Sequence, residues 1–425
     1  MTKKIIFLLL LTTFYSYGQI SIKEEALNLF KAEQYNDAIL LLEEAVKNNP
    51  NDAELFYYLG WFNHYNAYDT RPLKGYDFTF SKKIFEYLDK AIELNPNYGD
   101  AKYFFGAECS GNAFQAMQNY DLEKLKYFYK LAYSKGAYPK WLIEYGENIL
   151  NSCEENAILF TAGNADFDVC MYLQLHENFR KDVTLIPIGN IDRPWYVKFL
   201  KDGLDEEIKK IKINLTDEQI MDIHPFKWKP TSINILTSNN DQKKYDLQNK
   251  NTFSWLVNPD LISDRMHSKI ESETASKRSY LSPQRAILLQ IVEDNYSERP
   301  IFFSNFASPV FYGGLEKQFE NYGLISKLTP IETKNTKWEI NFEKLNTVIN
   351  AKNISNFHTI SKSDIPRISG LIKFGYSYNL DLLIQYYQKE SCEKCLKKLN
   401  EVYLNNLKSG FSDKNNKYFN SAFKI

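Results

Sequence analysis

The sequence has few cysteines and few histidines, so it offers few candidate metal ligands and few candidate catalytic side chains of these types. Each type occurs five times in 425 residues. The histidines are His64, His176, His224, His267 and His358. They are isolated in the sequence and lack metal-ligand spacing with cysteine or acidic residues. A G-x-S-x-G nucleophile motif is also missing. We therefore expect neither a bound metal nor a cofactor. Whether the protein is an enzyme stays open, and these observations favour a protein that is not one.

The cysteines are too few and too scattered to form a disulfide framework. They are Cys109, Cys153, Cys170, Cys392 and Cys395. The odd number leaves at least one thiol unpaired within the chain. Cys392 and Cys395 have the spacing of a redox motif, but such chemistry needs the pair after a strand at the start of a helix. Because helical sequence flanks this pair on both sides, we expect a local disulfide or two packed thiols.

Long apolar runs are absent beyond the first few residues. Two lysines precede an apolar run over residues 5–14, and Ser16 and Gly18 lie three and one positions before Gln19. This pattern predicts a secretory signal peptide over residues 1–18. The run is well short of the roughly 20 apolar residues that a bilayer-spanning anchor needs. We expect a periplasmic protein with no membrane span after cleavage between Gly18 and Gln19.

Excess charge of either sign is absent as well. Removing Lys3 and Lys4 from 52 basic residues leaves 50 against 53 acidic residues, a net charge of −3 for the expected mature chain. This balance gives no electrostatic reason to expect nucleic acid or an anionic membrane as a partner. Aromatic residues make up 15% of the chain and suit both cores and binding surfaces.

What the sequence does contain is an internal repeat near its N-terminus. Residues 39–60 align with residues 85–106, always 46 positions apart. The matched pairs are Leu42 with Leu88, Ala45 with Ala91, Asn49-Pro50-Asn51 with Asn95-Pro96-Asn97, Tyr57 with Tyr103, and Gly60 with Gly106. Each copy predicts one helix ending near Asn-Pro and a second beginning after it, because proline lacks the amide hydrogen and clashes with the preceding turn.

At these positions the chain resembles the tetratricopeptide repeat family, whose units end in a small residue, a large apolar residue and proline. The residues that fit are Ala38, Leu42, Ala45 and Pro50. The usual period is 34 residues, so about 12 extra residues fall in the segment over residues 64–80. A degenerate third unit over residues 98–146 completes an expected α-solenoid over residues 20–150.

The resemblance implies a protein-interaction module that receives a partner segment. Our candidates for contact with a partner are Tyr57, Trp61 and Tyr103. The alternative is that the repeats only pack against the downstream part of the same chain.

After residue 152 the pattern changes to short apolar runs rich in β-formers. Residues 157–161 and 183–188 flank a segment with helical spacing, which predicts a βαβ unit. Residues 232–238 and 299–305 predict further strands. We expect a small, mostly parallel α/β domain over residues 151–330, with helices on both faces. A helical hairpin is expected over residues 331–410 and a loosely ordered tail over residues 411–425.

Polar side chains cluster in the loops that follow these strands, where ligands bind in such sheets. They are Asn164, Asp166, Asp168, Asn190, Asp192, Arg193 and Asn305. Paired carboxylates can hold Mg²⁺ or Mn²⁺ with a sugar-nucleotide diphosphate, and Arg193 is suited to a phosphate contact. Asp166 and Asp168 also lie where aspartate serves as a helix cap, so a purely structural role is the alternative.

Residues 157–201 and 299–330 are similar to segments in the soluble C-terminal part of bacterial protein O-mannosyltransferase-like membrane proteins. The family's Asp-Asn-Asp triplet is here Asn164-Ala165-Asp166, so one acidic position is missing. The multi-span membrane part that resembles the catalytic unit is not represented either. The resemblance therefore implies an accessory portion of such a system rather than a mannose transferase.

Two functional hypotheses follow from these observations. The first is an exported protein-binding or scaffold protein that uses its helical repeats to hold a partner, as an accessory component of an envelope glycosylation or secretion complex. The alternative is a glycan-modifying enzyme or subunit that binds a sugar phosphate at the carboxyl ends of the α/β strands.

Overall fold

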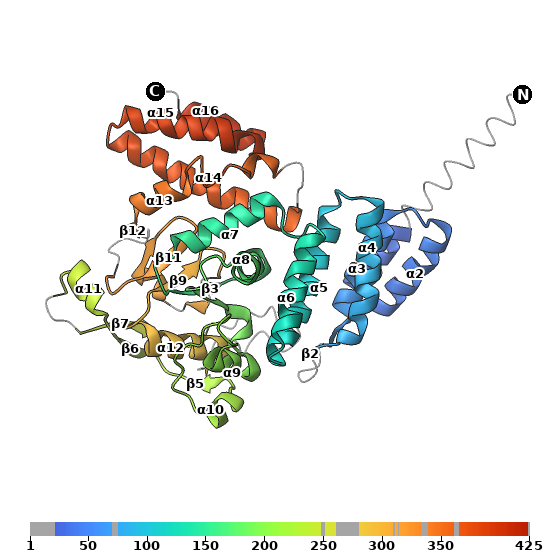
Figure 1. Ribbon diagram of the computed structural model, residues 1–425, viewed down its shortest axis with the longest axis horizontal. Helices are drawn as coiled ribbons and strands as arrows, with labels where there is room; N and C mark the ends of the chain where they lie inside the picture. The colour runs from blue at the N-terminus through green and yellow to red at the C-terminus, as the bar shows by residue number, and fades with distance from the viewer. Residues whose placement is uncertain are drawn as a thin grey trace, which may run out of the picture. The chain divides into compact units, whose positions relative to one another are not determined.

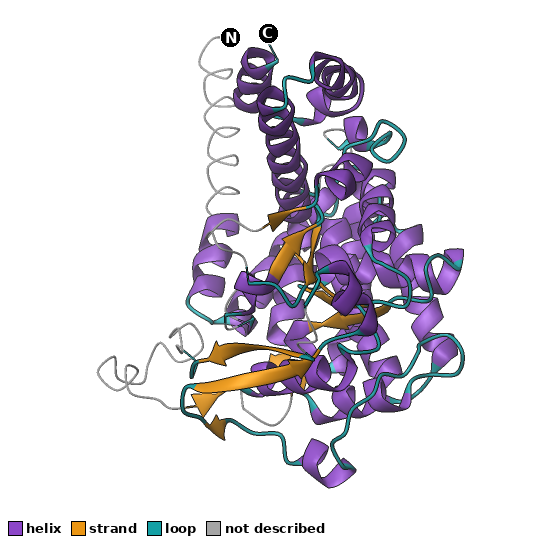
Figure 2. Ribbon diagram, turned by 90° about the vertical axis from the view of Figure 1, so that its left-hand side faces the viewer, coloured by secondary structure: helices purple, strands orange, loops and turns teal. Residues whose placement is uncertain are grey.

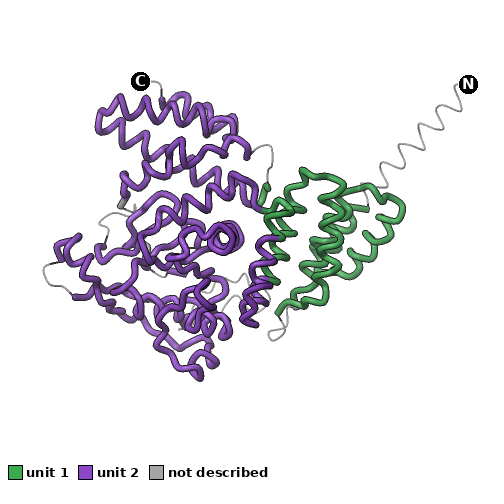
Figure 3. The backbone as a smooth tube through the Cα atoms, viewed as in Figure 1, with its two compact units in different colours: residues 1–112, 131–137, 363–367 green, residues 113–130, 138–362, 368–425 purple. Residues whose placement is uncertain are grey.

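The computed structural model describes eight stretches of the chain, and the expected signal peptide lies outside them. The described residues are 22–69, 75–247, 251–260, 280–308, 311–312, 314–332, 339–360 and 365–423. The chain divides into two compact units (Figure 3). Unit 1 comprises residues 1–112, 131–137 and 363–367, and unit 2 comprises residues 113–130, 138–362 and 368–425. The domain ranges expected from the sequence stay predictions, since compactness alone does not define an independently folding domain.

Unit 1 is built from helices that pack in sequence order. A helical stretch over residues 22–31 leads into α2 (Tyr35–Asn48), α3 (Ala53–Asn66), α4 (Ser81–Leu94) and α5 (Gly99–Gln118). The turn that contains Pro50 separates α2 from α3, as the repeat predicts. Helix α3 packs against both α2 and α4.

The segment between α3 and α4 contains more structure than an open loop. It includes β1 (Tyr68–Asp69), β2 (Gly75–Tyr76) and the short 3-10 helix η1 (Phe78–Phe80). The two strands pair antiparallel, with Tyr68 opposite Tyr76. The described part of this segment thus adds a small folded element between the two helices.

The main sheet of unit 2 has six strands. In spatial order they are β12 (Glu339–Ile340), β10 (Phe319–Asn321), β11 (Ile325–Leu328), β9 (Ile301–Ser304), β3 (Ile158–Thr161) and β4 (Thr184–Pro187). Strand β3 is parallel to both neighbours, with Phe160 opposite Ile186 on β4 and opposite Phe303 on β9. Strands β3, β4, β9 and β11 are buried along their whole length, so both faces of the sheet are covered.

The sheet is mixed: three of its pairings are parallel, and the two that involve β11 are antiparallel. Strand β11 runs antiparallel to both β9 and β10. The physical reason is the short connection between β10 and β11, where Gly323 adopts a φ of 104°. A short turn can join only antiparallel neighbours, whereas parallel strands need a long crossover. The expected strand over residues 232–238 forms as β6 (Thr231–Leu236), but it lies outside this sheet.

The remaining strands form two small antiparallel pairs. Strand β6 pairs with β7 (Thr252–Val257), and β5 (Phe226–Lys227) pairs with β8 (Tyr280–Leu281). Burial alternates along β7, which gives it one packed and one exposed face. Strands thus occupy a few places in a chain that is otherwise mainly helical (Figure 2).

The other helices follow the order labelled in Figure 1. They are α6 (Leu122–Ser134), α7 (Lys140–Ser152), α8 (Val169–Glu177), α9 (Pro194–Asp202), α10 (Asp217–Met221), α11 (Asn239–Lys244), α12 (Pro283–Asn295), α13 (Phe342–Val348), α14 (Pro366–Lys389), α15 (Glu393–Val402) and α16 (Asp413–Ala422). Helix α16 corrects the expectation of a loosely ordered tail. Ser412 caps its N-terminus, and the buried Phe419 lies 5.6 Å from the Tyr403 ring centre.

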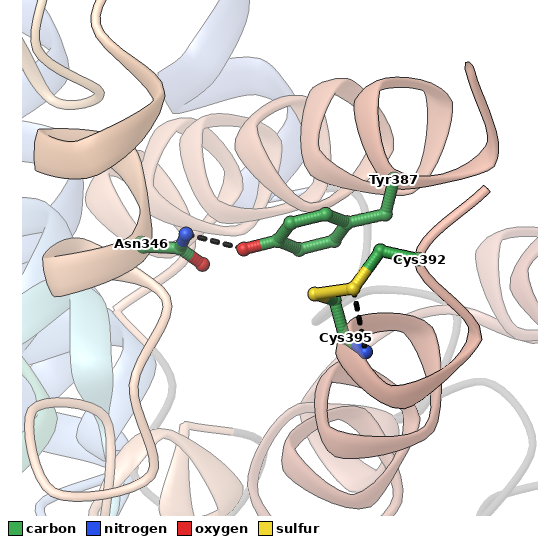
Figure 4. The surroundings of a disulfide bond; sticks show 4 residues. All are labelled: Asn346, Tyr387, Cys392 and Cys395. Atoms are coloured by element: carbon green, nitrogen blue, oxygen red, sulfur yellow. Dashed lines mark hydrogen bonds between the residues drawn. A yellow bond between two sulfur atoms is a disulfide. The ribbon is translucent and has the colours of Figure 1, made fainter. Parts of the chain in front are cut away.

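A disulfide joins Cys392 and Cys395 at the turn from α14 into α15 (Figure 4). The Cys392 sulfur also accepts a hydrogen bond from the Cys395 backbone N–H at 3.3 Å. On α14, the Tyr387 hydroxyl accepts a hydrogen bond from the Asn346 side-chain amide. A helix precedes the pair, not a strand, which agrees with the expected local disulfide.

Candidate functional site

Asp166 lies in the turn between the end of β3 and α8, within the short helical turn η2 (Asn164–Asp168). Its side chain is fully buried, with 0% exposure. The carboxylate accepts hydrogen bonds from the backbone N–H groups of Ala162, Gly163 and Phe167, each at 2.9 Å. The Phe167 N–H also donates to the Gly163 carbonyl at 2.7 Å, so the carboxylate serves mainly as the acceptor for the Ala162 and Gly163 N–H groups, and the turn folds around it.

The electrostatic surroundings of Asp166 also favour a structural role. Burial raises the pKa of its carboxyl group, while the backbone donors and the Ser304 side chain act in the opposite direction. Ser304 ends the neighbouring strand β9, so Asp166 links two adjacent strand ends. With its oxygens engaged by these donors, the side chain has little capacity left for a metal ion.

Asp168 and Asn164 occupy the same turn as Asp166. Asp168 is buried, and the Tyr129 hydroxyl of α6 donates to its carboxylate at 3.5 Å. Burial raises the pKa of Tyr129, and the negative charge of Asp168 adds to this effect. Asn164 is half-buried. The two aspartates thus contact different elements of unit 2: Asp166 accepts hydrogen bonds from its own turn, whereas Asp168 accepts one from α6.

The loop after β4 holds the next three candidates, on the short 3-10 helix η3 (Ile188–Asn190) and just beyond it. One oxygen of Asp192 accepts a hydrogen bond from the Gln284 side chain of α12 at 2.6 Å. Its other oxygen, Oδ1, is buried and has no hydrogen-bond partner among the described residues. Burial raises the pKa of Asp192, opposed by the charge of Arg193. Arg193 is exposed, and its backbone N–H donates to the Asn190 carbonyl at 3.1 Å.

Asn305 follows β9 and holds the β10–β11 hairpin. Its amide donates to the Gly323 carbonyl at 2.6 Å, and its side-chain oxygen accepts from the Ser326 hydroxyl at 2.8 Å. Its backbone N–H donates to the Leu324 carbonyl at 3.1 Å. Both the nitrogen and the oxygen of the Asn305 side chain therefore hydrogen-bond to the β10–β11 hairpin.

The seven candidates do follow three adjacent strands, because β9, β3 and β4 are neighbours in the sheet. Asp166 and Asn305 are engaged by the surrounding chain, whereas Asp192 keeps one oxygen without a partner in the described structure. Among the residues that the structure describes, no group of three or more histidine, cysteine or acidic side chains has the arrangement of a metal site.

The three residues expected to contact a partner gather in unit 1. Tyr57 and Trp61 lie on α3 with ring centres 5.7 Å apart, and Tyr103 lies on α5 beside Phe104. Phe104 in turn lies 5.9 Å from Trp61 and 6.0 Å from Tyr57. We call these four residues the aromatic cradle. Tyr57 is only 4% exposed, so it supports the cradle from within more than it forms an open surface.

A cation from a distant part of the chain occupies the aromatic cradle. The guanidinium carbon of Arg367 lies 4.9 Å from the Phe104 ring centre, 5.3 Å from Trp61 and 5.9 Å from Tyr103. These distances are within the range of cation–π attraction. The Asp100 carboxylate lies 3.7 Å from the guanidinium. Burial raises the pKa of Tyr57 to about 12, while a hydrogen bond to Arg367 opposes the rise.

Sequence reasoning did not identify Arg367, and it also missed a buried polar cluster in the same unit. Glu108 of α5 has 0% exposure and lies 2.8 Å from the His64 ring nitrogen Nδ1. The hydroxyls of Tyr76 and Ser81 donate to its carboxylate, as does the Asn112 amide at 3.1 Å. An acid within an apolar helical stretch was the available signal for this cluster. The cluster joins β2, α3, α4 and α5.

Arg180 and Asp182 form a bidentate ion pair before β4. Two guanidinium nitrogens of Arg180 each donate to Asp182 at 2.8 Å, and a third donates to the Leu150 carbonyl at the end of α7. The hydrogen bonds from Arg180 hold the pKa of Asp182 down at about 2. The lowered pKa means that this pair stabilises the fold above pH 4, and that the stabilisation is lost as the pH falls towards 2.

Replacing Arg180 with glutamine is expected to return the pKa of Asp182 towards its ordinary value near 3.8. The melting temperature should then fall less steeply between pH 4 and pH 2 than in the unmodified protein, although the variant is less stable at neutral pH. NMR titration of Asp182 and melting curves over pH 2 to 7 measure both effects. Lys198→Gln, which removes the exposed partner of Asp202, is the control and should leave the Asp182 titration unchanged. An unchanged Asp182 pKa in Arg180→Gln would contradict this assignment.

Comparison with known proteins gives one family match. Residues 142–276 match the family described as TMEM260-associated domain 2. This family is linked to O-mannosyltransferase-like proteins, so the match supports the expected resemblance over that part of the chain. The match includes the candidates that follow β3 and β4, but not Asn305. No curated protein and no solved structure matches the chain. Within the described residues, no helix is both long enough and apolar enough to cross a bilayer.

Proposed function

We propose that this chain is an exported, periplasmic protein-binding protein whose unit 1 holds a partner protein at the aromatic cradle. The observation that carries the proposal is the gathering of aromatic rings with Asp100, which already holds the Arg367 guanidinium and is therefore suited to a cationic side chain. Large aromatic residues and charge pairs of this kind dominate the binding energy of protein interfaces. Its proposed role is accessory, in an envelope protein-glycosylation or secretion complex, and the match to a family linked to O-mannosyltransferase-like proteins supports the glycosylation context.

Unit 1 is, in this proposal, a tetratricopeptide-like α-solenoid. The support for this architecture comes from the two aligned glycines of the internal repeat. A Cβ atom at Gly60 would lie 2.5 Å from the Leu88 side chain of α4, and one at Gly106 would lie 2.8 Å from the Ala137 side chain. Both positions therefore require glycine for the same reason, the close approach of a following segment. Equivalent packing at equivalent positions is what a repeat architecture requires.

The alternative function, a glycan-modifying enzyme or subunit, has one observation in its favour. The buried Oδ1 of Asp192 has no hydrogen-bond partner among the described residues, which leaves it free for a ligand. The engagement of Asp166 and Asn305 by the surrounding chain favours a structural role for those two candidates. The protein-binding proposal therefore has the broader support.

Photocrosslinking in cells tests the proposed function with the full chain. A photoreactive phenylalanine analogue replaces Tyr103 in the aromatic cradle, and the same analogue replaces the exposed Tyr418 of α16 as the matched control. We expect one discrete crosslinked protein from position 103 and none from position 418. Purification of that adduct and mass spectrometry identify the partner. Absence of a specific adduct at position 103 at native expression would refute the proposed function.

A further inference from the structure

The occupant of the aromatic cradle is part of the same chain, and it is only partly enclosed. Arg367 begins α14 together with Pro366, and its side chain remains 38% exposed although three rings and one carboxylate surround the guanidinium. The preceding Ile365 is buried. The cradle thus accepts an arginine from a short, proline-containing segment without sealing it away from solvent.

The chemistry of the cradle selects arginine over other cations. A guanidinium is planar, stacks on aromatic faces and is less strongly hydrated than an ammonium group. Trp61, Tyr103 and Phe104 offer those faces, and Asp100 supplies a negative charge 3.7 Å from the guanidinium. A lysine would keep the charge but lose the stacking geometry and the planar donor arrangement.

We propose that the aromatic cradle is an arginine-recognition site, which Arg367 occupies as an internal ligand and which a partner enters with an arginine of its own. This inference rests on the proposed function and specifies the chemistry of the partner, a polypeptide segment that presents arginine. Arg367 competes with the partner from within the same molecule. The cradle therefore discriminates against segments that bind too weakly to displace it.

The competition reduces the apparent affinity for any external segment. A tethered ligand acts at an effective concentration on the order of millimolar. If its own contacts in the cradle have a dissociation constant about tenfold lower than that, a free segment binds about tenfold more weakly than it would to an empty cradle. Removing the Arg367 side chain should therefore strengthen binding, although the substitution adds no contact to the external segment.

The test measures binding of a capped synthetic peptide, IPRISGL, which copies residues 365–371. Full-length Arg367→Ala should bind it about tenfold more tightly than the unmodified protein in calorimetric titration. A peptide with lysine in place of arginine should bind more weakly. Adding Trp61→Ala to Arg367→Ala should abolish binding. Lys414→Ala, which removes an exposed cation of unit 2, is the matched control and should behave as the unmodified protein.

Two further measurements separate a failure of this inference from misfolding of the variant and from failure of the proposed function. Circular dichroism checks that Arg367→Ala is folded, and Arg367→Gln is the second variant if it is not. Equal or undetectable peptide binding by the folded variant and the unmodified protein overturns the inference. Crosslinking at Tyr103 separates this failure from failure of the proposed function. A partner captured there without peptide binding refutes only arginine recognition, whereas peptide binding without a captured partner supports arginine recognition and refutes the proposed function.

Discussion

Replacing Glu108 with alanine is expected to lower the free energy of unfolding by about 3 kcal/mol, the scale observed when one member of a buried polar pair is removed. The carboxylate is fully buried and accepts hydrogen bonds from Tyr76, Ser81 and Asn112 while lying 2.8 Å from His64. Alanine removes the acceptor of the buried Ser81 hydroxyl and opens a cavity, whereas the Asn112 amide keeps the Glu108 backbone carbonyl at 2.9 Å. Guanidinium unfolding followed by circular dichroism measures the loss.

The matched control is Glu86→Ala, an exposed glutamate on α4 of the same unit. Its ion pair with Lys82, at 4.0 Å, is of the weak surface type, so the change should stay within about 0.5 kcal/mol. Ser81→Ala removes a single donor and should cost about 1 kcal/mol. An unfolding free energy for Glu108→Ala within 1 kcal/mol of the unmodified protein would show that the cluster does not hold unit 1 together.

Replacing Asp166 with alanine is expected to destabilise unit 2, again by about 3 kcal/mol. The backbone N–H groups of Ala162 and Gly163 and the Ser304 hydroxyl lose an acceptor, and each buried donor left without a partner costs about 1 kcal/mol or more. Asp166→Asn keeps one accepting oxygen and should have an intermediate effect. Thermal and chemical unfolding, read from the near-ultraviolet signal of the aromatic residues, measure both variants.

Asp192→Ala is the control for Asp166. Asp192 makes one hydrogen bond to Gln284, and burial already opposes its charge, so the expected change is within about 1 kcal/mol. Titration of the same proteins with Mn²⁺ and a nucleotide sugar distinguishes a structural from a ligand-binding carboxylate. An Asp166→Ala protein that keeps its stability but loses binding of these ligands would contradict the structural role.

The sequence predicted those parts of the fold that depend on local patterns. Pro50 and Pro96 mark the turns between helices because proline cannot continue the preceding helix hydrogen bonding. The βαβ unit from β3 to β4 follows from two apolar runs with helical spacing between them. The order of β9, β3 and β4 brought the expected loops to one edge of the sheet.

What the sequence left open depends on contacts between distant residues. The direction of β11 is set by its hairpin with β10 and by its pairing with β9, and the sequence of residues 325–328 carries no sign of direction. Helix α16 was missed because its sequence is mostly polar and only Phe419 is buried along it. Asp166 was found as a candidate, but its three backbone donors are a property of the folded turn.

The residues that form the aromatic cradle and the arginine that lies against it are synthesised at different times. Unit 1 consists of residues 1–112, 131–137 and 363–367, so its last piece is synthesised long after its first. A ribosome makes the chain from the N-terminus, and early helices can pack while later ones are still absent. Until residue 367 has been added, the rings of Trp61 and Phe104 have no internal cation. A chain that ends before residue 367 therefore lacks the arginine that lies against these rings, whereas every longer chain carries it.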